Sequence, residues 1–507
     1  MNTNSTTEQP RVLATRRQWF ALVVLMLPTL LVSIDNTVLS FALPSIARDL
    51  LPSATAQLWI VDAYPLVLAG LLVAMGNLGD RFGRRRMLLI GASGFGLVSV
   101  LAAFAPDATL LIAARVLLGF FGAMIMPSTL SLLRSLFADR RQRRLAIAVW
   151  ATGFSAGSAV GPLVGGVLLE HFWWGSIFLI AVPLLLPLLI LAPVLIPESK
   201  DPSPGPFDLL SIVLSMLALA PAVYAVKEIA TEGFGPVPAV LLAVGVVSGV
   251  LFVRRLLGQD NPMLDMKLFR VPSFSGAVIV NLVSVFSLVG FLFFITQHLQ
   301  LVLGMSPFDA AMALAPGTVV IIIAGLVVVP VVRRIRPGFL MAFGLALSLV
   351  AYASIAIIGD GATTLSLIVA FCVLGAGIGA AETLSNDLII SSVPADKAGA
   401  ASGVSETAYE LGAVLGTAVL GSILTASYRD SIVIPESLTA ADATAARETL
   451  GGAVEVASTL PTGIAGQLLD SARHAFDSGV TTTSWVAVAL MAVAITVTLV
   501  TLRKARG

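Results

Sequence analysis

Charged residues are scarce in this sequence. Asp, Glu, Lys and Arg make up 12% of its 507 residues, whereas hydrophobic residues make up 57%. A soluble domain carries about 25% charged residues. The mean hydropathy of +0.97 is correspondingly high. The composition therefore excludes a soluble protein.

Cysteine and histidine are also rare. Cys372 is the one cysteine, which excludes an internal disulfide. His171, His298 and His474 share neither a helix face nor a ligand spacing, so we expect no metal site. We find no nucleotide-binding loop and no nucleophile–base set. We therefore predict a protein that is not an enzyme, needs no cofactor and binds no nucleic acid.

Long apolar runs fill most of the chain. A bilayer core about 30 Å thick needs roughly 20 apolar residues per helix, whereas a membrane β-barrel shows alternating segments of roughly 10 residues. The runs here are continuous, which predicts an all-α polytopic membrane protein. We expect fourteen spans, at residues 18–41, 56–78, 87–105, 109–132, 145–168, 175–196, 208–229, 237–256, 274–297, 307–330, 338–358, 364–387, 402–426 and 480–502.

The positions of the basic residues predict the orientation. With the N-terminus inside, the cytoplasmic segments hold 24 Lys and Arg and the outer segments hold five; Arg115 alone lies within a span. This bias follows the positive-inside rule and places both termini in the cytoplasm. We read the first span as a retained helix rather than a signal peptide. The five basic residues assigned to the outer side are Arg48, Lys227, Arg429, Arg447 and Arg473.

Two segments do not read as membrane spans. Residues 197–207, "PESKDPSPGPF", read as a cytoplasmic linker, and residues 427–479 read as a long outer loop. Helical periodicity returns within that loop at 440–457 and at 464–476, with "LPTG" between them. We expect two short helices that pack as a hairpin; a disordered loop is the alternative.

A few charges lie inside the expected spans. A charge at the bilayer centre costs at least a few kcal/mol, so its presence there indicates a function. Desolvation disfavours the charged form of a carboxyl, so a buried carboxyl can hold a proton near neutral pH or attract an organic cation. This is the minimal chemistry of an exchanger. The charges are Asp35, Asp62, Arg115, Glu382, Glu406 and Glu410.

An acid near a span end can instead be simply solvated. We prefer that interpretation for Asp208 and Asp387 and leave it open for the others. Glu406 and Glu410 are four residues apart and so share a helix face. Asp62 lies between two aromatic residues, Trp59 and Tyr64, a combination suited to a delocalised cation.

Arg115 lies toward the outer half of its span and needs a carboxylate or carbonyl partner. Asp35 or Asp62 could reach it.

Two glycine-rich motifs indicate moving parts. "GNLGDRFGRRRML" (76–88) sets Asp80 among arginines, which predicts an ion-pair cluster at an inner loop. "GSAVGPLVGG" (157–166) spaces small residues four apart, so that helices can approach closely, and Gly161-Pro162 adds a kink. Packing alone could explain these glycines; the combination favours a pivot.

These stretches together resemble the major facilitator superfamily, and within it the fourteen-span drug:proton antiporters. "IDNTVLSFALP", "GNLGDRFGRRR", "RVLLGFFGA" and "GSAVGPLVGG" are similar to four family motifs, in order and at the matching spans. The resemblance implies two six-helix bundles around a central cavity that opens alternately to each side. The implied parts are a cytoplasmic N-terminus at 1–17, a first bundle at 18–197, a linker and two inserted helices at 198–256, and a second bundle at 257–507 with the outer loop at 427–479.

The resemblance also implies roles for individual residues. Proton coupling would involve Asp35, Arg115 and Asp62. The substrate would meet Asp62, Trp59, Tyr64, Glu382, Glu406 and Glu410. The gate would use Asp80, Arg81, Gly83 and Arg84, together with Gly157, Gly161, Pro162, Gly165 and Gly166. The loop "VVRRIRPGF", between the spans 307–330 and 338–358, corresponds to the motif "GNLGDRFGRRR". It keeps the arginines but lacks the Gly and Asp, so a second ion-pair cluster there should be weaker.

The implied function is export of lipophilic cationic dyes and antiseptics, driven by a proton gradient, in a bacterial cytoplasmic membrane. Fluoroquinolones are a further candidate class, because the acids could accept their amine end. We expect the protein to work as a monomer in the lipid bilayer. Three alternatives remain: export of an endogenous lipid or siderophore-like amphiphile, a membrane sensor with a transporter fold and, least favoured, a membrane enzyme.

Overall fold

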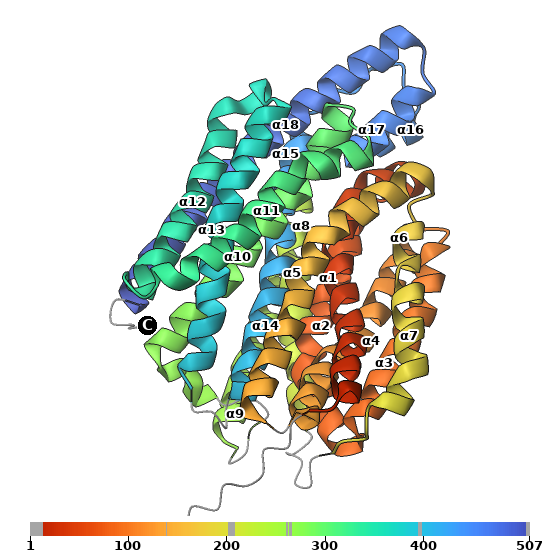
Figure 1. Cartoon of the computed structure of the whole chain (residues 1–507). Coiled ribbons are helices and arrows are strands. Elements are labelled where there is room, and N and C mark those ends of the chain that lie inside the picture. The colour runs from red at the N-terminus through yellow and green to blue at the C-terminus, as the bar shows by residue number, and fades with distance from the viewer. Residues whose placement is uncertain are drawn as a thin grey trace, which may run out of the picture.

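Long helices run side by side through the molecule (Figure 1). The computed structural model describes residues 14–137, 139–200, 208–259, 262, 266–393 and 398–502, and these contain no β-strand. Residues 201–207 of the linker expected at 197–207 and the N-terminal residues 1–13 lie outside the described residues. The helices of the apolar stretches are α1 (Arg16–Leu50), α2 (Ala54–Phe82), α3 (Arg84–Ala103), α4 (Ala108–Leu136), α5 (Arg140–His171), α6 (Ser176–Leu179), α7 (Ala181–Leu195), α8 (Leu209–Glu232), α9 (Pro236–Leu257), α10 (Pro272–Gln297), α11 (Pro307–Val331), α12 (Pro337–Ile358), α13 (Thr364–Ser391), α14 (Ala398–Gly416), α15 (Ser422–Ser431) and α18 (Thr462–Thr501).

The predicted membrane class is confirmed. Among the described residues, thirteen helices are long and apolar enough to cross a bilayer, with α6 and α7 forming one span and α14 and α15 another. The remaining expected span, 145–168, lies in α5, whose described apolar part is the shorter Val160–His171. Short non-α turns join several pieces: η1 (Met266–Arg270), η2 (His298–Val302), η3 (Gly359–Gly361) and η5 (Thr417–Gly421).

Local sequence signals set where the helices begin. The side chains of Thr15, Ser53 and Asp107 accept hydrogen bonds from the first turns of α1, α2 and α4, which stabilises those helix starts. Four later helices, α9 to α12, each begin at a proline. Proline suits this position because its missing N–H would have no partner in the first turn.

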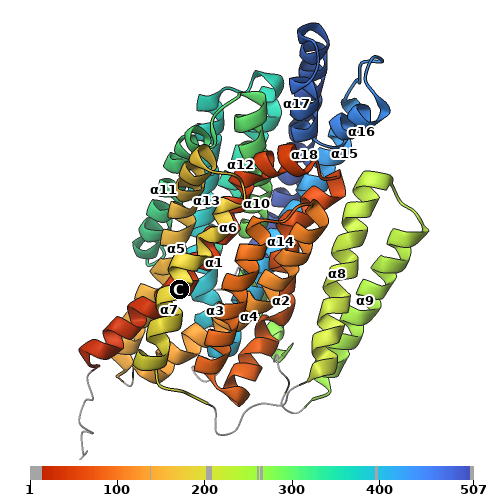
Figure 2. The ribbon, with the colours of Figure 1, turned by 90° about the vertical axis from the view of Figure 1, so that its right-hand side faces the viewer.

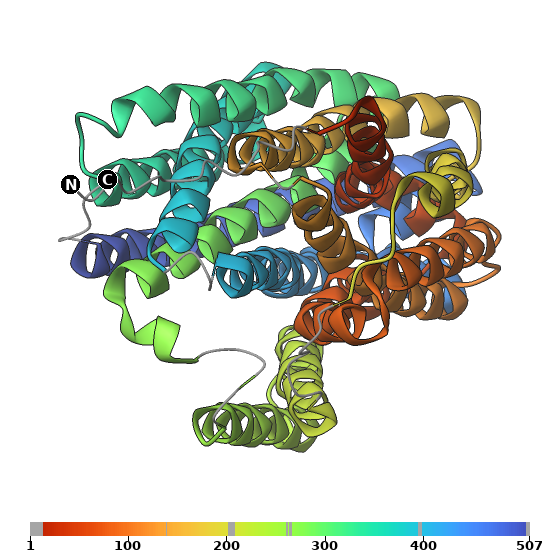
Figure 3. The ribbon, with the colours of Figure 1, turned by 60° about the horizontal axis from the view of Figure 1, so that its bottom comes forward.

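The buried apolar residues form two large clusters. One draws on residues 21–196 and the other on residues 268–502, with Phe41, Leu43 and Leu58 of the first half reaching into the second cluster. Helices α8 and α9 lie beside these halves, as Figures 2 and 3 show, and α8 contacts α2 and α15. Their outward apolar side chains, such as Leu209 and Val246, are more than half exposed, as expected of surfaces that face lipid.

The segment 440–476 does not form the predicted hairpin of two short helices. Residues 440–457 form two helices, α16 (Ala440–Glu448) and α17 (Leu450–Ser458), because Thr449 is extended and caps α17 by accepting a hydrogen bond from Gly452. The second predicted helix, 464–476, does not stand alone: it is the start of the 40-residue α18, which continues as the last span. Between Thr462 and Thr501 the chain has no proline that would end the helix. We call the part of the molecule around α16 and α17 the hairpin end, and the opposite part the termini end (Figure 1).

The two halves are joined at the hairpin end. The Gln57 side chain bonds that of Gln297 at 3.2 Å, and Gln300 Nε2 donates to the Phe41 carbonyl at 3.0 Å. A third bond runs from the Ala54 amide to the Glu448 carboxylate at 2.7 Å. Buried polar bonds between halves are directional, so they fix how the halves meet here.

Candidate functional site

Asp35 and Arg115 form an ion pair in the interior. Asp35 Oδ2 on α1 lies 2.7 Å from Arg115 NH1 on α4, and the two residues are 8% and 1% exposed. Arg115 Nε also donates to the Ile60 carbonyl of α2 at 3.1 Å. The sequence left Asp35 and Asp62 as possible partners of this guanidinium, and the structure selects Asp35.

Tyr64 packs on the same guanidinium. The Arg115 carbon Cζ lies 4.7 Å from the centre of the Tyr64 ring, and Tyr64 is fully buried. A guanidinium over an aromatic face is stabilised by the ring's electron density. Tyr64 therefore supports the Asp35–Arg115 pair.

Asp62 pairs with Lys227, a residue that the distribution of basic residues had assigned to the outer side of the membrane. The Lys227 ammonium on α8 lies 2.8 Å from Asp62 Oδ2, and both side chains are fully buried. The same ammonium lies 3.9 Å from the centre of the Trp59 ring. The assignment of Lys227 to an outer segment was therefore wrong: contact with α2 buries it in the protein.

The remaining interior acids lie on α13 and α14. Glu410 is 1% exposed and shares a hydrogen bond with Asn36 of α1, whereas Glu406 and Glu382 are half-buried and close enough to interact electrostatically. After α14 the chain passes through the π-helical η5, where Thr417 lies near Asp62. Short π-helical segments occur often at functional sites. Helices α1, α2, α13 and α14 thus bring five carboxyls into the interior, and Arg115 and Lys227 are the basic side chains that pair with two of them.

The glycines of α5 lie against α1. A Cβ on Gly157 would lie 2.5 Å from Ser33 Cβ and 2.8 Å from the Leu30 carbonyl oxygen, and one on Gly161 would overlap Thr37. Gly165 faces Val38 of α1 in the same way, and Gly166 faces the start of α11 in the other half. Pro162 lies within the helix and removes one backbone donor. Two helices that touch through glycine over three turns have few side chains to impede sliding.

Gly157→Ala should lower the stability of the protein. The added methyl group has no room against α1, and overpacking of this kind costs about 1–3 kcal/mol. Thermal unfolding in detergent measures the change. Gly153→Ala is the matched control, because a Cβ there meets its nearest neighbours at 3.7 Å. Equal unfolding temperatures for the two variants would contradict the close packing.

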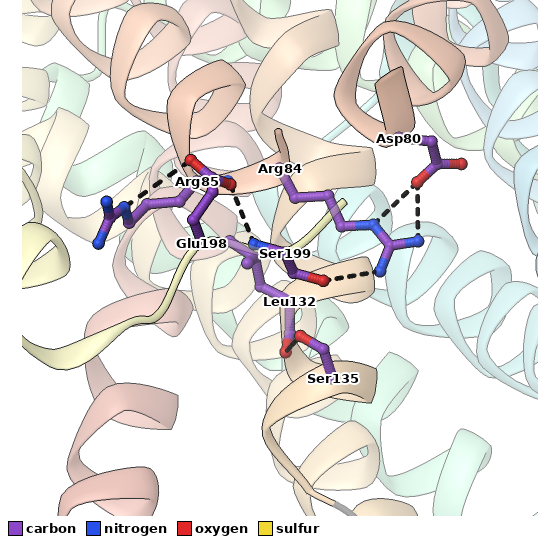
Figure 4. A network of polar contacts seen from close by, with 7 residues as sticks. All are labelled: Asp80, Arg84, Arg85, Leu132, Ser135, Glu198 and Ser199. Atoms are coloured by element: carbon purple, nitrogen blue, oxygen red, sulfur yellow. Dashed lines mark hydrogen bonds and ion pairs between the residues drawn. The ribbon is translucent and has the colours of Figure 1, made fainter. Parts of the chain in front are cut away.

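The predicted arginine cluster forms two ion pairs at the termini end, one between Asp80 and Arg84 and one between Arg85 and Glu198, whose charged atoms lie 3.9 Å apart. Asp80 Oδ1 lies 2.8 Å from Arg84 NH2, and Arg84 also donates to the Ser199 hydroxyl at 3.2 Å (Figure 4). Arg81, expected in the same cluster, is exposed and contributes no ion pair among the described residues. The cluster therefore rests on two carboxylates, Asp80 and Glu198, which pair with Arg84 and Arg85.

Glu198 of "PESK" caps the N-terminus of α3, although the two are far apart in the sequence. Its carboxylate accepts hydrogen bonds from the Arg85 and Arg86 amides at 3.0 and 3.2 Å. These amides open α3, whose preceding residue Gly83 has no side chain to cap it and adopts φ 116°. A Cβ on Gly83 would lie 2.7 Å from the Glu198 carboxyl carbon. Glycine is thus required here by both its backbone angle and the approach of Glu198.

Glu198→Ala should destabilise the protein by about 1–2 kcal/mol, the range for loss of an N-terminal cap and of a negative charge at a helix start. Glu198→Gln should retain part of the effect, because an amide oxygen still accepts hydrogen bonds. Chemical or thermal unfolding of the purified protein would measure both. Glu170→Gln, an exposed site, is the control. A Glu198→Ala variant as stable as wild type would contradict the capping role.

Asp208 is not the solvated acid that the sequence suggested. It is 7% exposed, caps α8 through the Ser211 amide, and lies 2.8 Å from Arg255 Nε of α9. Hydrogen bonds from Arg255, Ser211 and Gln259 hold the pKa of this carboxyl well below its usual range. The pair ties the start of α8 to the end of α9. Asp387, by contrast, is exposed.

The helical fold and its buried ion pairs define a polytopic membrane transporter. The sequence model of the Major Facilitator Superfamily matches residues 25–417, and the chain belongs to that family.

The named relatives are efflux, export and resistance proteins. The chain is 57% identical to the multidrug efflux pump LfrA of Mycolicibacterium smegmatis, over 99% of both chains. It is 38% identical to the methyl viologen resistance protein SmvA of Salmonella typhimurium, over 91% of this chain and 93% of the relative. It is 33% identical to the tetracenomycin C resistance and export protein of Streptomyces glaucescens, over 96% and 92%.

Solved structures show the same fold. A bacterial homologue of the human lysosomal transporter Spinster, in an inward-facing and occupied conformation, superimposes with a TM-score of 0.65 at 17% identity, over 97% of this chain and 98% of the other. A D-xylose–proton symporter follows with a TM-score of 0.58 at 17% identity, over 80% and 90%. The chain is therefore a transporter of the Major Facilitator Superfamily rather than an enzyme.

Proposed function

We propose that this protein exports lipophilic organic cations in exchange for protons. The observation that carries the proposal is the group of buried and half-buried carboxyls on α1, α2, α13 and α14, which outnumber Arg115 and Lys227, the basic groups paired with two of them. A carboxyl in such a place can hold either a proton or a cationic substrate, but not both. Substrates would include cationic dyes and antiseptics, with fluoroquinolones as a further class.

We place the termini end in the cytoplasm of a bacterial cell. The basic residues of the loops concentrate there, as in the Asp80–Arg84 cluster, and Lys227 no longer counts against this bias because it is buried within the protein. Basic loops remain on the cytoplasmic side of a membrane. The hydrogen bonds across the hairpin end then support a state closed to the outside. The proposed parts are two bundles, 18–197 and 257–507, with 198–256 inserted between them.

The cycle follows from this arrangement. A drug cation enters from the termini end, takes the place of protons on Glu406 and Glu410, and reaches Asp62, which pairs with an ammonium in this structure. Within the first half, α5 then slides on α1 along their glycine contact, and the Gln57–Gln297 contact between the halves breaks. Protons from outside return to the acids and eject the drug. Asp35 and Arg115 couple the protonation to the movement, because they join α1, α4 and α2.

The stoichiometry sets the driving force. One proton exchanged for one monovalent cation moves no net charge, so only the pH difference drives export, at about 1.4 kcal/mol per pH unit. A second proton adds the membrane potential, about 2.3 kcal/mol per 100 mV. The number of interior acids favours more than one proton per cycle. A transport current of zero in a sided electrical assay would contradict this.

Ethidium transport in inside-out vesicles tests the proposal. Vesicles with wild-type protein should accumulate ethidium when their interior is made acidic, and should stop when the gradient is dissipated. Empty vesicles give the background. If wild type moves no cationic dye under any gradient, the proposal fails, and export of an endogenous amphiphile becomes the leading function.

A further inference from the structure

We propose that Lys227 is a built-in competitor of the drug cation: its ammonium occupies the cation subsite formed by Asp62 and Trp59. This inference rests on the proposed function. It makes Lys227 a residue that sets affinity for cations, a role beyond that of a structural counter-ion.

The contacts of the ammonium are those expected for a bound cation. It lies 2.8 Å from a carboxylate oxygen and 3.9 Å from the centre of an indole ring, with no exposure to solvent. A carboxylate with an aromatic face is the pair of groups that recognises lipophilic organic cations. The Trp59 ring lies 6.1 Å from Tyr224, which extends the aromatic wall by one residue.

The residues come from two helix faces that oppose each other. Trp59 and Asp62 are three apart on α2, and Tyr224 and Lys227 are three apart on α8, so each pair shares one helix face. Next to them, Leu66 of α2 packs with Val223 of α8 and with Val414 and Ala418 of the second half. The ammonium thus comes from the inserted helix pair, while the carboxylate comes from the first half.

The single negative charge of Asp62 allows this buried site to hold one cation at a time. Asp62 faces Lys227 from α8 and Thr417 from η5, and also feels the charge of Arg115 on α4. With its carboxylate already neutralised, a second cation beside the ammonium would be repelled. A drug cation can therefore take Asp62 only when the ammonium withdraws on its flexible stem or gives its proton to water. In either case one cationic charge replaces another at the carboxylate.

Equilibrium binding of tetraphenylphosphonium to the purified full-length protein in lipid nanodiscs tests the inference. The buffer is alkaline, so that protons compete little for the carboxylate freed by substitution. Lys227→Met and Lys227→Gln remove the competing charge and should each bind about tenfold more tightly than wild type. Lys227→Arg keeps a cation and should bind like wild type. Lys200→Met, the same change at an exposed lysine, is the matched control and should have no effect.

The contrary results are distinct. If Lys227→Met and Lys227→Gln bind no tighter than wild type, the competitor role is overturned, and Lys227 only neutralises Asp62. Glutamine can still hydrogen-bond Asp62, so this variant decides the matter if the methionine variant fails to fold. Adding Asp62→Asn to Lys227→Met should abolish the gain; a gain that persists would also overturn the inference. Failure of the proposed function is separate, since wild type would then move no cationic dye in vesicles.

Discussion

Asp35→Asn should lose nearly all gradient-driven efflux of ethidium while still binding it. The asparagine has almost the same shape but cannot exchange a proton or neutralise Arg115, whose guanidinium lies 2.7 Å away. Dye binding should survive, because Asp62, Glu406 and Glu410 are unchanged. Vesicle transport and equilibrium binding, measured on the same preparation, separate the two effects.

The matched control for this variant is Asp49→Asn. It makes the same change on the same helix, but Asp49 is exposed near the end of α1. It should transport ethidium as wild type does. An Asp35→Asn protein that still accumulates dye against a proton gradient would show that Asp35 is not the coupling residue.

Arg115→Met should destabilise the protein more than either Gly157→Ala or Glu198→Ala does. It leaves Asp35 buried without its cation and the Ile60 carbonyl without its donor. Removing one member of a buried ion pair costs about 3–5 kcal/mol. We expect a large fall in unfolding temperature in detergent, together with poor expression.

A second substitution distinguishes charge from packing. In the double variant with Asp35→Asn, no uncompensated carboxylate remains, so part of the lost stability should return. Arg429→Met is the comparison for a partly exposed pair, since Arg429 lies 3.6 Å from Glu448 with 23% of its side chain exposed; surface pairs contribute about 0–1 kcal/mol. If the double variant is no more stable than Arg115→Met, the energy lies in packing against Tyr64 rather than in the charge pair.

The sequence could predict the helices because each apolar run must be long enough to cross a bilayer. It could also select Asp35 and Arg115, since a charge within such a run is costly unless paired. It could not choose between Asp35 and Asp62 as the partner of Arg115. That choice depends on how α1, α2 and α4 are rotated against one another, which no spacing within one helix determines.

Lys227 was missed for a related reason. A lysine near the end of an apolar run normally extends its ammonium to the membrane surface. Only the contact between α8 and α2, far apart in the sequence, buries it against Asp62. The continuity of α18 was missed because the polar residues between 462 and 479 indicated a short outer helix that was separate from the last span. Glu198 gave no local signal, since it caps a helix more than a hundred residues earlier.

The most direct test of drug–proton exchange uses a gradient of the drug to move protons, the reverse of the vesicle assay above. Proteoliposomes without an imposed pH gradient are loaded with ethidium and diluted into dye-free buffer, while a pH-sensitive dye reports on the interior. The account predicts that outward dye movement acidifies the interior through wild-type protein and not through Asp35→Asn. Ethidium that leaves wild-type liposomes faster than empty ones, with no change of internal pH, would contradict it.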